Sequence, residues 1–146
     1  MSVVMNGLVT ATEGTSRVLL AGTTSSIATL QHLASGLGER VRGQVFVEVA
    51  SAAEIVPFET PELITVAWLV RETRSGEPGT CETCRPGQAL GRAVRAWVSE
   101  MSTGDLEVDG GELVVFIDGT DALVHELRLD MVDRIGSSTG SGTFVR

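Results

Sequence analysis

The stretch that decides the fold is VLLAGTTSSIATLQHL, which runs from Val18 to Leu33. It opens with the apolar run Val18–Ala21, which is typical of a strand buried on both faces. Gly22 ends this run, and the small hydroxyl residues Thr23–Ser26 follow. Apolar residues then recur at the three- and four-residue intervals of an amphipathic helix, at Ile27, Leu30, Leu33, Ala34 and Leu37. The sequence therefore predicts a strand, a tight polar turn and a helix.

The polar turn Thr23–Ser26 has two interpretations. Backbone N–H groups and the helix dipole favour an anion at the start of a helix, and nucleotide-binding folds place phosphate there. Alternatively, serine and threonine at these positions are ordinary helix N-caps, as in any α/β domain. The residues alone leave both interpretations open.

Length and charge exclude several classes of protein. The chain has 146 residues, of which 42% are hydrophobic, and a net charge of −8. This length predicts one globular domain, and the acidic balance argues against a nucleic-acid partner. All 11 basic residues are arginine and tyrosine is absent, which excludes a lysine nucleophile, a P-loop lysine and a tyrosine acid or base. Apolar runs fall short of the roughly 18 residues of a membrane span, and the first residues do not resemble a secretion signal. We expect a cytoplasmic protein that does not contact a membrane.

Further apolar runs and amphipathic segments alternate along the chain. The expected elements are strands at 44–50, 63–70 and 113–117, helices through 90–98 and 123–135, and a last short strand at 143–145. Strands that are apolar on both faces, alternating with amphipathic helices, predict an α/β three-layer sandwich. This fold has a mostly parallel sheet with helices on both faces. We expect residues 1–16 to be a lead-in and residues 17–146 to be one domain.

Parallel strands bring their carboxyl ends to one edge of the sheet, where α/β proteins bind their ligands. The four ends that should meet there are Gly22–Thr23, Ala50–Ser51, Arg71–Glu72 and Asp118–Gly119. The sequence therefore predicts a single binding edge.

Four stretches also carry a family resemblance: VLLAG (Val18–Gly22), VFVEVASAAE (Val45–Glu54), TVAWLVR (Thr65–Arg71) and LVVFIDGTDALVHELR (Leu113–Arg128). In this order and spacing, the chain resembles the C-terminal, nicotinamide-nucleotide-binding domain of siderophore-interacting proteins. Those proteins are flavin-dependent ferric-siderophore reductases of the ferredoxin-reductase-like superfamily. The resemblance implies a Rossmann-like nucleotide-binding domain across most of the chain.

The resemblance implies a site for NADP or NAD at the predicted edge. Its candidate cofactor-binding residues are Gly22, Thr23, Thr24, Ser25, Ser26, Ser51, Arg71, Asp118 and Gly119. The hydroxyl turn would contact the pyrophosphate of the dinucleotide. Arg71 would bind the 2′-phosphate of NADP, since a guanidinium matches phosphate geometry; the alternative is an exposed arginine paired with Glu72 or Glu54. Asp118 and Gly119 would lie where the nicotinamide meets the flavin in full-length enzymes, or Asp118 would cap the next helix.

The remaining reactive residues do not form a catalytic pattern. Cys81 and Cys84 are a lone CxxC within the long polar loop 73–87, which could be a redox pair, half of a metal site or a strained disulfide. We expect incidental or labile thiols and no metal site, because two cysteines supply too few ligands. His32 and His125 should lie at the solvent borders of helices. We assign no catalytic residue.

The chain also departs from the family pattern. Thr23 and Thr24 stand where the family carries an acidic pair, and Thr120 rather than a glutamate follows Gly119. Residues 1–16 are too few for the family's flavin-binding barrel, so we expect no FAD site in this chain. The first hypothesis is a stand-alone domain that binds NAD(P)H and supports ferric-siderophore reduction in iron uptake with a separate flavin-bearing partner. On this hypothesis the chain is at most the NAD(P)H-binding part of an oxidoreductase. The alternative is a non-catalytic protein-interaction module, for example a homodimer, that has kept the fold and lost the nucleotide.

Overall fold

The computed structural model describes residues 2–4, 17–103, 113–139 and 143–145. Its strands are β1 (Ser2–Val4), β2 (Arg17–Thr23), β3 (Arg42–Val49), β4 (Ile64–Val70), β5 (Leu113–Ile117) and β6 (Thr143–Val145). Its α-helices are α1 (Ile27–Ser35), α2 (Gln88–Thr103) and α3 (Ala122–Thr139). Short 3₁₀ turns follow three of the strands, at Thr24–Ser26, Ala52–Glu54 and Arg71–Thr73.

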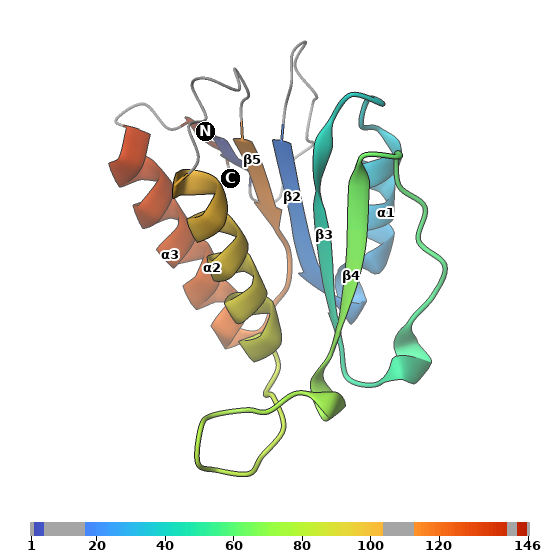
Figure 1. Ribbon diagram of the computed structural model, residues 1–146, viewed down its shortest axis with the longest axis vertical. Helices are drawn as coiled ribbons and strands as arrows, with labels where there is room; N and C mark the ends of the chain where they lie inside the picture. Colours follow the sequence, from blue (N-terminus) through green and yellow to red (C-terminus); the bar gives the residue numbers. More distant parts are fainter. Residues whose placement is uncertain (1, 5–16, 104–112, 140–142, 146) are drawn as a thin grey trace.

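The strands form one sheet in the order β4-β3-β2-β5-β1-β6. Every strand pair in this sheet is parallel. Figure 1 shows α1 on one face of the sheet, and α2 and α3 together on the other. The predicted α/β three-layer sandwich is therefore confirmed. The short strand expected at 143–145 is present as β6.

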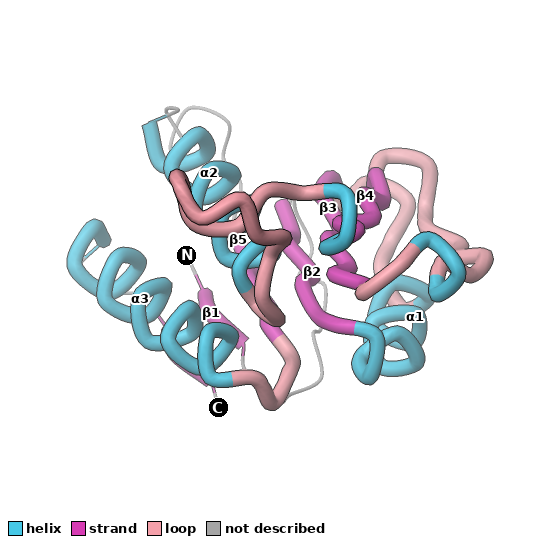
Figure 2. Tube along the Cα trace, turned by 90° about the horizontal axis from the view of Figure 1, so that it is seen from below, coloured by secondary structure: helices cyan, strands magenta, loops and turns pink. Residues whose placement is uncertain are grey.

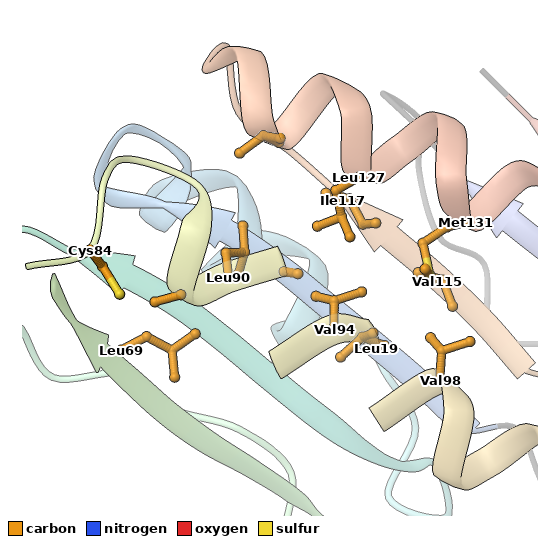
Figure 3. Close-up of a cluster of buried hydrophobic side chains, with 13 residues drawn as sticks. Leu19, Leu69, Cys84, Leu90, Val94, Val98, Val115, Ile117, Leu127 and Met131 are labelled. Atoms are coloured by element: carbon orange, nitrogen blue, oxygen red, sulfur yellow. The ribbon is translucent and has the colours of Figure 1, made fainter. Parts of the chain in front are cut away.

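The strand β2, with which the stretch Val18–Leu33 opens, is buried on both faces, as its unbroken apolar run predicts. Leu19 and Ala21 belong to a core cluster beneath α2 and α3. Val18 and Leu20 belong to a second cluster beneath α1. Figure 3 shows the first cluster, in which Leu90, Val94 and Val98 of α2 face the sheet. The alternation of side chains along β2 thus joins the two halves of the core.

The order of the strands creates a crossover point at β2. From β2 the chain proceeds outward through β3 to β4, and then returns across the sheet to β5 on the other side of β2. In open α/β sheets, the crevice at such a reversal is where ligands bind. Figure 2 is seen from the end of the molecule onto which the β2–α1 turn and the β4–α2 loop open. The carboxyl ends of β4, β3, β2 and β5 therefore share one edge.

Two further observations concern the ends of the chain and its helices. Residues Ser2–Val4 form β1, which pairs with β5 and β6, whereas the sequence predicts only a lead-in there; the rest of the lead-in lies outside the described residues. Among the residues that the structure describes, no helix is long and apolar enough to cross a membrane.

Candidate functional site

The turn between β2 and α1 is tightly folded, and Gly22 is required for it. A Cβ atom at Gly22 would lie 2.7 Å from the Cβ of Ser26, closer than real Cβ atoms approach. Thr24–Ser26 form a single 3₁₀ turn, and α1 begins directly after it at Ile27. The hydroxyls of Thr23 and Ser25 lie 3.2 Å apart and share a hydrogen bond. The turn therefore gathers small hydroxyl residues around the end of β2.

These hydroxyls do not serve as ordinary N-caps. Thr23 precedes the 3₁₀ turn and Ser26 precedes α1, yet neither side chain makes a capping hydrogen bond. Ser26 is 1% exposed, and its Oγ has no hydrogen-bond partner in the described part of the chain. A buried hydroxyl without a partner is uncommon and calls for an explanation. The N-cap interpretation of the turn is thus not supported at either position.

The end of β5 lies directly beside this turn. The Asp118 N–H donates to the carbonyl of Ala21 at 2.9 Å. Gly119 has a φ of 149°, and a Cβ there would lie 3.5 Å from Cγ2 of Thr23. A side chain at Gly119 would therefore be strained, and its Cβ would lie closer still to Val124 of α3, at 3.1 Å. Asp118 and Gly119 thus lie at the β5 end of the shared edge, beside the β2–α1 turn.

An arginine that the sequence did not single out fixes the end of β5. Arg128 of α3 donates from Nε to the carbonyl of Ile117 at 3.1 Å, and from Nη2 to the carbonyl of Gly119. Its Nη2 also lies 3.9 Å from Oδ1 of Asp118. The helix begins only at Ala122, so Asp118 does not cap it. Asp118 instead takes part in a small polar cluster with Arg128.

A buried charged residue at this edge is Glu48 of β3. Glu48 is 2% exposed, and its carboxylate lies at the start of α2. Its Oε1 accepts the N–H of Gly87 at 2.7 Å, and its Oε2 accepts the N–H of Leu90 at 2.8 Å. Backbone N–H groups at a helix start need acceptors, and a carboxylate also complements the helix dipole. Glu48 therefore closes the N-terminus of α2 from inside the protein.

Glu48 is also the ion-pair partner of Arg71. The Nε of Arg71 lies 3.5 Å from Oε1 of Glu48, and the Arg71 side chain is 25% exposed. The sequence predicts Glu72 or Glu54 as the partner of an exposed Arg71, whereas the ion pair in the structure is with Glu48. One signal was available, because a charged residue in the apolar run of β3 can be buried only if it is paired.

Glu54 lies at the same edge, just beyond β3. Its Oε1 accepts the N–H groups of Ala50 at 2.6 Å and Ser51 at 3.3 Å. These two N–H groups, the Thr24 hydroxyl and the charge of Arg71 hold the pKa of Glu54 below its ordinary value of 4.5, with the Ala50 N–H contributing most and desolvation opposing them. The sequence-predicted residues Thr24, Ser51 and Arg71 therefore all surround Glu54.

The long loop after β4 holds both cysteines, which are free. Cys84 is 5% exposed, and its thiol donates to the carbonyl of Ser75 at 3.1 Å. Arg92 of α2 donates to the carbonyls of Ser75 and Gly76, both at 2.6 Å. Cys81 is exposed, so the two thiols occupy different environments. Residues of the loop, Cys81 among them, line an open hollow of about 430 Å³.

The remaining candidate groups show no catalytic arrangement. His32 and His125 are both exposed on their helices, as the sequence predicts. Within the described residues, no three metal-ligating side chains come together. The polar groups that do converge are those of the β2, β3, β4 and β5 ends.

A parallel sheet with a hydroxyl turn, a glycine and charged groups at its crossover point defines an α/β domain with a candidate ligand edge at that point. The family model that matches the chain is that of siderophore-interacting proteins, over residues 15–143. The chain belongs to the siderophore-interacting protein family.

Three solved structures are similar to this chain, and one of them superposes closely enough to show the same fold. A siderophore utilization protein from T. fusca superposes with a TM-score of 0.55 at 19% identity, over 93% of this chain and 47% of that one. The siderophore-interacting protein SipS from Aeromonas hydrophila gives 0.41 at 14% identity, over 72% and 39%. A siderophore-interacting protein from Acinetobacter baumannii gives 0.41 at 12% identity, over 88% and 56%. This chain thus spans about half the length of the solved proteins it matches, and a search of curated proteins found no match.

Proposed function

We propose that this chain is a cytoplasmic nucleotide-binding domain that binds NAD(P)H at the shared strand edge. It supports ferric-siderophore reduction together with a separate flavin-bearing partner. The chain supplies binding and orientation in this reaction, and the cofactors carry the hydride. Membership of the siderophore-interacting protein family supports the role in ferric-siderophore reduction.

The single observation that carries this proposal is the crossover point between β2 and β5. The ends of these strands are joined by the hydrogen bond from the Asp118 N–H to the Ala21 carbonyl. Gly22 and Gly119 carry no side chain near these two strand ends; a Cβ at Gly22 would meet Ser26, and one at Gly119 would meet Val124 of α3. A flat ring or a phosphate can approach such a backbone closely. The dinucleotide would therefore lie across this crevice.

The β2–α1 turn supports the position of the pyrophosphate. Two residues that could have capped the helix start, Thr23 and Ser26, leave it uncapped by side chains. A phosphate oxygen at this position would accept backbone N–H groups and gain from the dipole of α1. The hydroxyl of Ser26, next to Gly22, is buried and has no hydrogen-bond partner within the described residues, so the hydrogen-bonding capacity of this turn is not used up by the protein itself.

Titration calorimetry of the purified chain with NADH and with NADPH tests the proposal. We expect saturable binding of at least one nucleotide, with AMP and ADP-ribose binding more weakly. A Gly22→Ala variant should lose most of this affinity, because the new methyl group would force the turn open. The matched control is Gly38→Ala, where a Cβ meets no atom within 4 Å. Absence of binding for both nucleotides at millimolar concentration would exclude the proposal.

The flavin-bearing partner needs a separate assay. The chain mixed with NADH, free FAD and a ferric siderophore should show little ferrous iron release. Addition of the flavin-binding portion of another siderophore-interacting protein should raise the rate of ferrous iron release in proportion to the concentration of this chain. A rate that does not depend on the chain would remove the supporting role in reduction while leaving nucleotide binding intact.

One observation favours the non-catalytic alternative as a second candidate. The charge of Arg71 and the start of α2 are both engaged by Glu48, so neither is offered freely to an external anion. Ile55, Val56 and Leu63, in the connection between β3 and β4, are each at least 40% exposed. A self-associating module would cover these side chains, and light scattering after size exclusion would detect the dimer.

A further inference from the structure

The carboxylate of Glu54 lies at the carboxyl end of β3, although the residue itself comes several positions later in the chain. The side chain folds back, so that Oε1 reaches the N–H of Ala50 at 2.6 Å and that of Ser51 at 3.3 Å. The whole of β2 pairs with β3, and Thr23 lies opposite Glu48. The Glu54 carboxylate, at the end of β3, therefore lies beside the β2–α1 turn. The chain thus fixes an acidic group next to the place proposed for the pyrophosphate.

Two neighbours define what Glu54 can recognise. The Thr24 hydroxyl and the charge of Arg71 both act on its carboxylate. Arg71 is already paired with the buried Glu48 at 3.5 Å. Two carboxylates therefore interact with the charge of one guanidinium, so these three groups together carry a net negative charge.

The chemistry of a carboxylate at this position is specific. In dinucleotide-binding folds the pyrophosphate lies at the first strand-to-helix turn, and an acidic group near the end of the adjacent strand accepts hydrogen bonds from the adenosine ribose. An ionised carboxylate only accepts hydrogen bonds and has about four lone-pair positions. Oε1 of Glu54 receives the two backbone N–H groups, so acceptor positions remain for a ligand hydroxyl.

Resting on the proposed nucleotide site, we propose that Glu54 accepts the ribose hydroxyls of the adenosine and excludes a 2′-phosphate, so that the site takes NADH in preference to NADPH. A 2′-phosphate would be placed against the carboxylates of Glu54 and Glu48 and compensated by Arg71 alone. This proposal replaces the 2′-phosphate role expected for Arg71 from the family resemblance. In it, Arg71 is the ion-pair partner of Glu48, and its charge favours the ionised form of Glu54.

The experiment compares three forms of the full chain: wild type, Glu54→Gln and the control Glu72→Gln. Glutamine keeps an oxygen that can accept the Ala50 N–H, so Glu54→Gln should remain folded, which a thermal melt checks. Glu72 is exposed on the neighbouring 3₁₀ turn, so its substitution changes the net charge equally without touching the site. Calorimetry measures the NADH and NADPH dissociation constants of each form at low and high salt.

We expect wild type to bind NADH at least about tenfold more tightly than NADPH, because like charges brought together at a site are strongly unfavourable. Glu54→Gln should reduce this ratio about tenfold, mainly through tighter NADPH binding. Glu72→Gln should change the preference for NADH over NADPH less than about twofold. High salt should reduce this preference in the wild type. Arg71→Ala should weaken both nucleotides alike.

Several results would overturn the proposal, and they differ from failure of the proposed function. Wild type binding NADPH as tightly as NADH would exclude it while leaving the nucleotide site established. An unchanged ratio in Glu54→Gln, or equal effects of Glu54→Gln and Glu72→Gln, would remove the role of Glu54. A selective loss of NADPH in Arg71→Ala would return the 2′-phosphate to Arg71. Absence of binding for both nucleotides in every form would exclude this proposal and the proposed function together.

Discussion

The starts of α1 and α2 open onto the same edge of the sheet, but they are treated in opposite ways (Figure 2). At α2, the buried carboxylate of Glu48 accepts the N–H groups of Gly87 and Leu90. At α1, neither Thr23 nor Ser26 provides a side-chain cap. Both helix starts attract negative charge for the same physical reason. The start of α2 is satisfied by the protein itself, whereas the start of α1 has no side-chain cap at these two positions.

This difference indicates where along the edge an anion can bind. A ligand phosphate at α2 would have to displace the carboxylate of Glu48, whose side chain is 1% exposed and is also paired with Arg71. A ligand phosphate at α1 would meet no such side-chain cap at Thr23 or Ser26. The edge is therefore polarised, with a closed side at β3–α2 and an open side at β2–α1.

The largest expected effect comes from removing the closed cap. Glu48→Ala leaves two backbone N–H groups without their acceptor and Arg71 without its partner. We expect a loss of about 3 kcal/mol in the free energy of unfolding, measured by urea denaturation. Glu48→Gln keeps an acceptor oxygen and should lose less. A cost for Glu48→Ala no greater than that of the exposed Glu72→Ala would show that the closed side is not stabilised in this way.

A smaller effect is expected from crowding the open turn. Gly22→Ala places a methyl group 2.7 Å from the Cβ of Ser26. We expect it to reduce the free energy of unfolding by about 1–3 kcal/mol, whereas Gly38→Ala should stay within about 0.5 kcal/mol of wild type. Thermal and urea melts of the two variants give the comparison. Equal stability of the two variants would mean that the β2–α1 turn is not tightly packed.

The loop on the closed side should depend on Arg92. Arg92→Ala removes the donors to the carbonyls of Ser75 and Gly76, and the loop should then open more often. We expect cleavage within residues 73–87 by a low dose of protease to become several-fold faster. The matched control is Arg95→Ala on the same helix, because Arg95 pairs with Asp130 of α3 at 2.9 Å and does not contact the loop. Similar cleavage rates for both variants would contradict the anchoring role.

The smallest expected effect is the pH dependence of the contribution that Glu54 makes to stability. The pKa of Glu54 is below 4.5 in the folded chain. Its contribution to stability is therefore present above about pH 4.5 and is lost as the pH falls through the folded-state pKa. Glu54→Gln should consequently differ most from wild type at neutral pH and converge with it on acidification. Urea melts from pH 6 to pH 3 measure this difference, and a constant difference across that range would contradict the assignment.

The sequence predicted the fold well because its apolar patterns are unambiguous. The run Val18–Ala21 is apolar at every position, and the structure buries it on both faces. The strand predicted at 113–117 has the same bounds as β5. The strand β1 at Ser2–Val4 was missed because three residues give no periodicity. Hydrophobic patterning thus located the elements and the edge that they share.

The polar contacts of the edge could not be predicted in the same way. The sequence identified Thr24, Ser51 and Arg71 as neighbours of one site, but it did not identify the carboxylates between them. Glu48 stands in an otherwise apolar strand, and nothing local to it indicates which helix start it meets. Glu54 reaches the site only because its side chain folds back onto Ala50. Such contacts depend on three-dimensional packing rather than on periodicity, and whether the site binds a nucleotide remains a prediction.

The cap on α2 has a consequence for how the protein folds. Glu48 precedes Gly87 by 39 residues and Leu90 by 42, so α2 has no such acceptor until β3 and the helix have come together. The helix start and the centre of the sheet should therefore form late and in one cooperative step. In native-state hydrogen exchange, the amides of Gly87 and Leu90 should exchange only when the whole domain opens. These two amides would then report global unfolding from a position at the edge of the candidate site.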